Sequence, residues 1–372
     1  MTLPERAVAI VTGGGTAGHV LPALAVADAL VDAGHDREAI VYAGSERGIE
    51  TRLVPPSGFP LVLLPGRGIQ RRLTLANVAA VWGLLRAAVQ AVALVRRLRP
   101  RVVVAVGGYA SVAVGLAAVL WRVPLVVAEQ NAAPGAANRL LARFARASAV
   151  SFEGTPLPRA VVTGNPVRPE IRAIDPERDR ARARAALGVG EGRRLVLVFG
   201  GSLGALRINQ AVVDALPAWR DRSDLAVHHV VGDRDWEVIG AAAPSDLGVL
   251  QYRAVRYEDD MPTALAAADL AVCRAGSGTC FELAAVGLPA VLVPSPHVTA
   301  DQQTANARRL VHAGAARLVP DAELDGARLI AEVDTLLADD AARAEMAAAA
   351  RRWARPDAAE RIAALALEHA RA

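Results

Sequence analysis

Short apolar runs alternate with longer amphipathic segments along almost the whole chain. Such runs occupy residues 7–11, 39–43, 102–106, 124–128 and 148–151. Runs of this length, bounded by loops, are typical of buried parallel strands. Most of them precede a longer segment with the periodicity of a helix. The alternation therefore predicts α/β architecture, with helices on both faces of a parallel sheet.

The same pattern restarts in the second half of the chain. Residues 193–216 predict a strand, a glycine loop and a helix, and further strands are predicted at 226–231, 248–251, 269–273 and 290–293. We therefore predict two doubly wound, Rossmann-like domains facing a central cleft. Their predicted boundaries are 1–167 and 193–345, with an arginine-rich linker at 168–192 and C-terminal helices at 346–372 that pack back toward the first domain.

Composition narrows the class of protein. With 53% hydrophobic and 22% charged residues the chain is expected to be globular, and a net charge of +4 is too small to predict nucleic-acid binding. The two cysteines, Cys273 and Cys280, predict neither a disulfide framework nor a zinc site and fit a reducing compartment. No signal peptide is recognisable at the start. The uncharged segment 102–121 has the length of a membrane span, but the central GGYAS predicts a strand, a loop and a helix instead.

Four glycine loops carry the main chemical signal. They are GGGTAGH at 13–19, GGYAS at 107–111, GGSLGA at 200–205 and RAGSGT at 274–279. Each follows a predicted strand and opens a predicted helix, so that backbone N–H groups can meet an anion. Tight turning alone explains any single loop, but four of them favour a phosphate-bearing ligand.

Other cofactor classes are less well supported. The first loop satisfies G-x-G-x-x-G, but no acidic residue ends the second strand at residues 43–45, so a nicotinamide-dependent oxidoreductase is disfavoured. No Walker A motif is present. Asp233 and Asp235 lack supporting carboxylates and predict a loop, while the neighbours His228 and His229 point to opposite faces of a strand. We expect no metal site and no cofactor.

Three further motifs carry a family resemblance. They are EQNAAPGAANRL at 129–140, GNPVR at 164–168 and CRAGSGTCFELAAVGLPAVLVPSPHVTADQQTANA at 273–307. Together with the four loops they resemble the MurG family of bacterial glycosyltransferases over nearly the whole chain. The resemblance implies a GT-B fold and transfer of N-acetylglucosamine (GlcNAc) from UDP-GlcNAc, with inversion. The acceptor would be the 4-hydroxyl of MurNAc in undecaprenyl-pyrophosphoryl-MurNAc-pentapeptide, so that lipid I becomes lipid II in peptidoglycan synthesis. A UDP-GlcNAc 2-epimerase of the same architecture is the alternative.

The resemblance also implies roles for individual residues. The donor ribose would be held by Glu282, whose carboxylate can accept from two hydroxyl groups, and the diphosphate by Ser277, Gly278 and Thr279. Further implied contacts are Gln302, Gln303 and Asn131 near the sugar, Ser202 at a phosphate, Arg168, the backbone at Glu258 near uracil, and the acceptor loop residues Thr16, Ala17 and Gly18. The family often has glycine where this chain has Ala17, which weakens the inference of a close backbone approach there.

His19 is the leading candidate for the catalytic base. It opens a helix in the acceptor half, and a neutral imidazole could accept the proton of the attacking hydroxyl. We expect the positive helix end to lower its pKa. A helix-capping role for His19 is the structural alternative, Glu129 could share or replace the base, and Tyr109 is a further candidate that could equally pack under its loop.

A lipid acceptor requires a membrane contact without a membrane span. Residues 67–99 combine apolar positions with arginines, and residues 138–147 add three more arginines; this predicts a peripheral protein on an anionic, cytoplasmic membrane face. The positions are Leu73, Leu75, Val78, Val81, Trp82, Leu85, Arg71, Arg72 and Arg86, then Arg139, Arg143 and Arg146. Amphipathic helices that cover the sheet would give a similar pattern. The resemblance further implies partners among the proteins of cell-wall synthesis and division.

Overall fold

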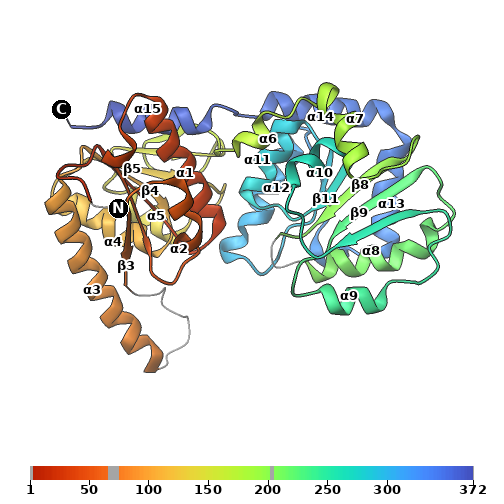
Figure 1. The fold of residues 1–372 in the computed structure, drawn as a ribbon, viewed down its shortest axis with the longest axis horizontal. Helices are drawn as coiled ribbons and strands as arrows, with labels where there is room; N and C mark the ends of the chain where they lie inside the picture. The colour runs from red at the N-terminus through yellow and green to blue at the C-terminus, as the bar shows by residue number, and fades with distance from the viewer. Residues whose placement is uncertain (1–2, 66–74, 202–204, 372) are drawn as a thin grey trace. The chain divides into compact units, whose positions relative to one another are not determined.

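The chain forms two compact units (Figure 1). The computed structural model describes residues 3–65, 75–201 and 205–371, and only the backbone of residues 75–82 and 84. The first unit contains Met1–Val167 and Arg355–Ala372, and the second contains Arg168–Ala354. The segment predicted as a linker, 168–192, forms two helices of the second unit.

A seven-stranded parallel sheet lies at the centre of the first unit. Its order is β3-β2-β1-β4-β5-β6-β7, so the central strand β1 pairs with both β2 and β4, and Ala9 lies opposite Ile40 and Val102. The chain builds outward in opposite directions from β1 and β4, and ligands of such sheets bind beyond the carboxyl ends at this reversal. The strands are β1 (Ala9–Gly13), β2 (Ile40–Ser45), β3 (Leu61–Leu64), β4 (Val102–Gly107), β5 (Leu125–Glu129), β6 (Ala147–Val150) and β7 (Ala160–Val162).

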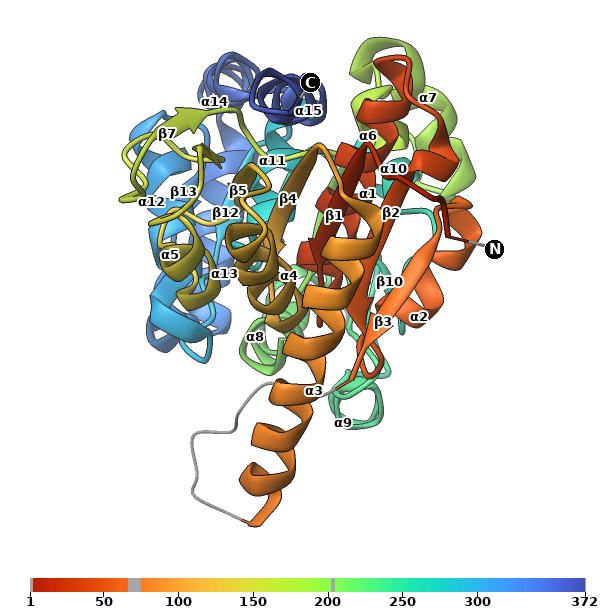
Figure 2. The same cartoon turned by 90° about the vertical axis from the view of Figure 1, so that its left-hand side faces the viewer.

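Helices cover both faces of this sheet. On one face α1 packs against α15, side by side in Figure 1, and their apolar residues share a core with those of β1, β2 and β4. On the other face α3 packs against α4, as Figure 2 shows. The helices are α1 (Ala17–Asp32), α2 (Glu50–Leu53), α3 (Leu75–Leu98), α4 (Tyr109–Leu120), α5 (Ala136–Leu141) and α15 (Ala358–Glu368).

The uncharged segment 102–121 divides as its central glycines predict, into β4 and α4. Across the described part of the chain, no helix combines the length and the apolar character that crossing a bilayer requires.

The second unit repeats this topology with six parallel strands. Their order is β10-β9-β8-β11-β12-β13, so the reversal lies between β8 and β11. The strands are β8 (Arg194–Phe199), β9 (Leu225–Val230), β10 (Gln251–Val255), β11 (Leu270–Cys273), β12 (Ala290–Leu292) and β13 (Arg317–Leu318). The helices are α6 (Pro169–Arg172), α7 (Pro176–Ala186), α8 (Leu206–Trp219), α9 (Trp236–Ala242), α10 (Met261–Ala267), α11 (Ser277–Val286), α12 (Gln302–His312), α13 (Gly326–Ala338) and α14 (Asp340–Trp353).

The sequence analysis missed three short strands, β3, β7 and β13. Each is two to four residues long, and none is fully buried along its length. All three lie at the edges of their sheets. An edge strand needs neither an apolar run nor a regular alternation, because one of its sides faces no neighbouring strand. Only pairing with the rest of the sheet identifies these segments.

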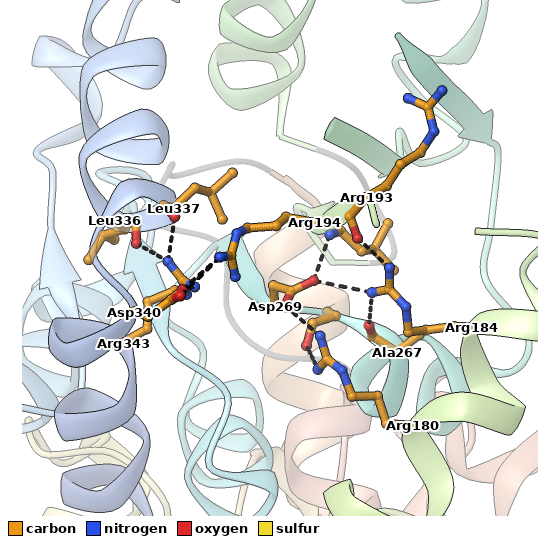
Figure 3. Close-up of polar contacts among 12 residues, drawn as sticks. Arg180, Arg184, Arg193, Arg194, Ala267, Asp269, Leu336, Leu337, Asp340 and Arg343 are labelled. Carbon is orange, nitrogen blue, oxygen red and sulfur yellow. Dashed lines mark hydrogen bonds and ion pairs between the residues drawn. The ribbon is translucent and has the colours of Figure 1, made fainter. Parts of the chain in front are cut away.

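Asp269 ties the helix α7 to the amino-terminal end of the second sheet. Its carboxylate accepts from Arg180 at 2.5 Å and from Arg184 at 3.2 Å, both on α7, and from the backbone N–H of Leu195 at 2.7 Å (Figure 3). The Asp269 side chain is only 12% exposed. Arg184 also donates to the carbonyl oxygen of Ala267. The two arginines of the predicted linker therefore belong to the core network of this unit.

We predict that Asp269→Ala lowers the free energy of unfolding of the second unit by about 2–4 kcal/mol, because it removes the carboxylate acceptor of two partly buried guanidinium groups and of one backbone N–H. Urea unfolding followed by circular dichroism measures the change. Asp246→Ala is the matched control, since its pair with Arg220 is exposed and should contribute about 0–1 kcal/mol. Equal losses in the two variants would contradict this account.

Candidate functional site

The first two glycine loops touch each other at the reversal of the first sheet. The N–H of Gly14 donates to the carbonyl oxygen of Gly107 at 3.2 Å. Gly108 has a φ of +85°, and a Cβ atom there would overlap the carbonyl oxygen of Gly14. Both the left-handed backbone and the close approach require glycine at this position. The hydroxyl of Ser111 lies 2.8 Å from the Thr12 oxygen and 2.7 Å from the Gly107 oxygen, which fixes the second loop beneath the first.

His19 lies over this loop contact. It is the third residue of α1, and its Nδ1 atom lies 3.3 Å from the hydroxyl oxygen of Thr16. A Cβ atom on Gly107 would lie 3.0 Å from Nε2 of His19, so the imidazole edge lies close to Gly107. Thr16 is the residue before α1, but its side chain makes no capping bond to the helix backbone. His19 is thus preceded by Thr16, which lies before α1, and by Ala17 and Gly18, the first two residues of α1.

The pKa of His19 is lowered from its ordinary value of 6.5. Burial is the largest cause, because it penalises the charged imidazolium. The carboxylates of Glu129 and Glu50 and the backbone of Gly14 act in the opposite direction and raise it. The direction agrees with the expectation from the sequence, but the cause is desolvation where the sequence argument named the helix end.

Glu129 has both carboxylate oxygens occupied. Oε1 accepts from the backbone N–H of Asn131 at 2.9 Å and from its side-chain amide at 3.3 Å. Oε2 accepts from the backbone N–H of Gly135 at 2.9 Å and from Nδ2 of Asn138 at 2.9 Å. Glu129 is buried at the end of β5. Its carboxylate therefore organises the loop that carries Asn131, and Asn138 is a residue of this site that the sequence analysis did not single out.

The hydroxyl of Tyr109 bonds to backbone oxygens outside the glycine loops. The hydroxyl donates to the carbonyl oxygen of Pro65 at 3.0 Å and lies 3.4 Å from that of Gly83. The ring packs against the core between the sheet, α3 and α4, and burial raises the pKa of the phenol. These contacts fit the packing interpretation of Tyr109.

Arg168 and Glu282 form an ion pair in the second unit. Nε of Arg168, the residue before α6, donates to Oε1 of Glu282 in the middle of α11 at 2.8 Å. Burial raises the pKa of Glu282, and the positive charge of Arg168 opposes this shift. The two motifs GNPVR and CFELAAVGLP, 114 positions apart, therefore meet in one site.

The amino-terminal turn of α11 lies beside this pair. Ser277, Gly278 and Thr279 form that turn, directly after β11 at the reversal of the second sheet. A Cβ atom on Gly278 would meet nothing within 4 Å. Oε1 of Gln303 accepts from the backbone N–H of Ser295 at 2.8 Å and of Ala275 at 3.3 Å. Gln303 thus joins α12 to the strand ends that carry this loop.

A strained turn precedes α12. Ala300 has a φ of +54° and Asp301 a φ of +49°, conformations that are unfavourable for residues with a Cβ atom. Such strain is concentrated at ligand sites. Gln302 and Gln303 follow it as the first two residues of the helix.

The carboxylate of Glu258 bonds to residues of its own unit. Oε2 lies 2.7 Å from Nε2 of His228, and Oε1 accepts from the backbone N–H of Asp260. His229 has separate partners, the hydroxyl of Tyr252 and the side chain of Asn209. The two histidines therefore share no ligand, as their positions on one strand predict. Ser202 lies outside the described residues.

The D-x-D motif has structural partners. Asp235 is buried and accepts from Nδ2 of Asn209 and from Arg234. Within the described ranges, no three His, Cys, Asp or Glu side chains come together as a metal site.

Comparisons with known proteins cover both units. Residues 9–150 match the glycosyltransferase family 28 N-terminal domain, and residues 195–362 match the family 28 C-terminal domain. The curated relatives include a UDP-N-acetylglucosamine--N-acetylmuramyl-(pentapeptide) pyrophosphoryl-undecaprenol N-acetylglucosamine transferase of Nocardioides sp., 45% identical over 96% of this chain and 97% of the relative. The transferase of the same name from Salinibacter ruber is 44% identical over 95% of this chain and 94% of its own.

Solved structures show the same relation. MurG of Acinetobacter baumannii superimposes with a TM-score of 0.78 at 30% identity, covering 98% of this chain and 100% of that one. A UDP-N-acetylglucosamine 2-epimerase of Listeria monocytogenes shares the fold, with a TM-score of 0.65 at 17% identity over 98% of this chain and 96% of that one. On sequence identity over nearly the full length, and on two GT-B-type parallel sheets, the chain belongs to the MurG family of glycosyltransferase family 28.

Proposed function

We propose that this protein transfers GlcNAc from UDP-GlcNAc to the MurNAc 4-hydroxyl of lipid I and so forms lipid II. The observation that carries the proposal is identity of 38–45% to curated transferases of this name across 95–100% of the chain. The 2-epimerases share only the fold, at 13–17% identity. An epimerase is therefore not favoured as the alternative.

His19 is the base in this proposal. Its lowered pKa keeps the imidazole neutral at physiological pH, as proton acceptance requires. If Nδ1 carries the proton toward Thr16, 3.3 Å away, Nε2 is left as the acceptor for the attacking hydroxyl. The negative charge of Glu129 then stabilises the imidazolium that forms. Glu129 is not the base in this proposal, because four donors already bond to its two carboxylate oxygens. It stabilises the charge on His19 and positions the loop that carries Asn131.

The donor lies in the second unit in this proposal. Glu282 accepts from the ribose hydroxyls, and the diphosphate meets the backbone N–H groups of Ser277, Gly278 and Thr279 at the positive end of α11. The same donors stabilise the charge that develops on the leaving UDP. Arg168 compensates the buried carboxylate of Glu282 and adds positive charge nearby. In this proposal Gln302 and Gln303, the first two residues of α12, contact the sugar hydroxyls, and Asn131 of the first unit lies near the sugar.

We predict that His19→Ala lowers kcat/KM by about 10²–10⁴-fold while the Kd for UDP stays unchanged, because the base is lost and the donor site lies in the other unit. Transfer of labelled GlcNAc to a short-chain lipid I analogue and calorimetry with UDP measure the two quantities. In the wild type, kcat/KM should fall as the pH drops through the lowered pKa of His19, below 6.5. His312→Ala is the control, since His312 is exposed at the end of α12. Full activity in His19→Ala would exclude His19 as the base.

We predict that Glu282→Gln weakens UDP binding about 10–100-fold, because charge-assisted hydrogen bonds from the ribose are worth about 1.5–3 kcal/mol. Calorimetry with UDP gives the Kd. The matched control is Glu237→Gln, which removes an exposed carboxylate paired with Arg256. Unaltered UDP affinity in Glu282→Gln would remove Glu282 from the donor site.

We further propose that the first unit contacts an anionic membrane from the cytoplasmic side. Leu85 and Val89 of α3 are 54% and 69% exposed, and Leu120 and Trp121 at the end of the neighbouring α4 are exposed as well. The Arg96 guanidinium lies 5.6 Å from the centre of the Trp121 ring. Val89, Arg96, Arg97, Arg99 and Trp121 line a surface depression of about 620 Å³. Apolar side chains beside arginines suit the interface of an anionic bilayer.

The other residues expected at the membrane surface lie near α5 or are not described by the structure. Arg139, Arg143 and Arg146 are exposed near α5, beside the exposed Phe144. Arg71, Arg72 and Leu73, and the side chains of Leu75, Val78, Val81 and Trp82, lie outside the described residues. Contacts with cell-wall and division proteins stay a prediction from the resemblance.

We predict that Leu85→Glu with Val89→Glu reduces binding to vesicles that contain phosphatidylglycerol at least about tenfold, because two charges would enter the interface. Flotation with purified protein measures the bound fraction. Val238→Glu is the control, since Val238 is 60% exposed on α9 of the second unit. Wild-type flotation of the double variant would rule out this surface.

A further inference from the structure

Glu50 is a fully buried carboxylate that the sequence analysis did not single out. It is the first residue of α2, directly behind the first glycine loop. Its Oε1 accepts from the backbone N–H of Gly15 at 3.1 Å and from that of Ser45 at 2.9 Å. Within the described ranges, Glu50 has no ion-pair partner. A buried acid held only by backbone donors is rare unless it has a specific task.

Three glycines make room for this side chain. A Cβ atom on Gly14 or on Gly48 would overlap the Glu50 carboxylate, and one on Gly44 would lie 2.8 Å from its Cγ. Gly14 lies in the first glycine loop, Gly44 in β2 and Gly48 in the turn after β2. The backbone of two separate loops is therefore shaped around one carboxylate.

The arrangement is costly for the fold. Oε2 of Glu50 is buried and has no hydrogen-bond partner among the described residues. An unsatisfied buried acceptor of this kind costs about 1–3 kcal/mol. Glutamine could accept the same two N–H groups without a charge, so acceptance alone does not account for a carboxylate.

The charge of Glu50 acts on His19. Gly15 has a φ of +90° and lies four residues before His19, so its bond to Glu50 fixes the loop that leads into α1. Glu50 from α2 and Glu129 from β5 are the charged groups that raise the pKa of His19 against burial. Tyr42 of β2 is the titratable neighbour of Glu50; burial raises its pKa first, and the Glu50 charge second. Its hydroxyl donates to the Gly13 oxygen.

We propose that Glu50 is a positioning residue of the transfer reaction. It fixes the position of His19 by holding the first glycine loop, and its negative charge stabilises the protonated form of the His19 imidazole. The inference rests on the proposed function, in which His19 takes the proton of the acceptor hydroxyl. In that step the proton moves from the hydroxyl oxygen to Nε2 of His19, and the negative charges of Glu129 and Glu50 stabilise the resulting imidazolium.

Glu50→Gln separates the charge from the hydrogen bonds. The carboxamide oxygen can keep both backbone donors while the negative charge is lost. We expect the imidazole of His19 to titrate at lower pH than in the wild type, because the charge that favours the imidazolium is gone. NMR titration of the histidine ring protons measures this directly, with the His19 signal assigned by His19→Gln. An unchanged His19 titration in folded Glu50→Gln would overturn the proposal, whether or not the protein transfers GlcNAc.

Activity provides the second readout. The acid limb of kcat/KM should move to lower pH in Glu50→Gln by the same amount as the ring titration. Glu50→Ala should lower kcat about tenfold or more with the Kd for UDP unchanged, since a displaced loop misplaces the base. Thr51→Ala is the matched control, because Thr51 is exposed on the same helix and its hydroxyl donates to the Gly48 oxygen. Wild-type kcat in a folded Glu50→Ala would overturn the positioning role.

A different experiment tests the proposed function. If the wild type forms no lipid II from lipid I, the transfer proposal is wrong, while the ring titration of Glu50→Gln still tests the link between Glu50 and His19. If Glu50→Ala does not fold, the His19 titration and the pH profile of Glu50→Gln decide whether the proposal for Glu50 holds.

Discussion

The contact between two glycine backbones at the strand reversal is the constraint on which the position of His19 depends. The N–H of Gly14 donates to the carbonyl oxygen of Gly107, and Gly108 approaches Gly14 so closely that no side chain fits between them. This contact exists because β1 and β4 are neighbours whose chains leave the sheet in opposite directions. The imidazole of His19 lies close to Gly107 of the same contact. A larger side chain at either loop would move the imidazole and the helix that carries it.

Electrostatic balance at His19 follows from that geometry. Burial against backbone favours the neutral ring, and the carboxylates at the ends of β5 and at the start of α2 favour the charged ring. A base needs both properties, since it must be unprotonated before the reaction and stable as a cation after it. The two carboxylates differ in their surroundings. Glu129 is saturated by four donors, whereas Glu50 keeps one oxygen unsatisfied.

The second unit uses the same topology for a different purpose. Its reversal, between β8 and β11, places the amino-terminal turn of α11 beside the ion pair of Arg168 and Glu282. Here a cation compensates the buried carboxylate directly. At the opposite end of the same sheet, Asp269 and its two arginines attach α7. Charged residues of this unit therefore lie at both ends of its strands, with the Arg168–Glu282 pair near the carboxyl ends and the Asp269 network at the amino ends.

The sequence by itself determined the architecture and most of the candidate residues. Strand runs, glycine loops and helix periods are local patterns, and they predict two doubly wound domains with His19 directly after the first glycine loop. The candidate roles of Glu129 and Glu282 came from the motifs that resemble the MurG family. Tertiary structure decided what each candidate can do. In the folded chain both oxygens of Glu129 accept hydrogen bonds, the hydroxyl of Tyr109 donates to Pro65, and Glu50 accepts from Gly15 in the first glycine loop. Those outcomes depend on partners up to tens of residues away, such as Gly15 and Glu50, and local patterns carry no information about such pairs.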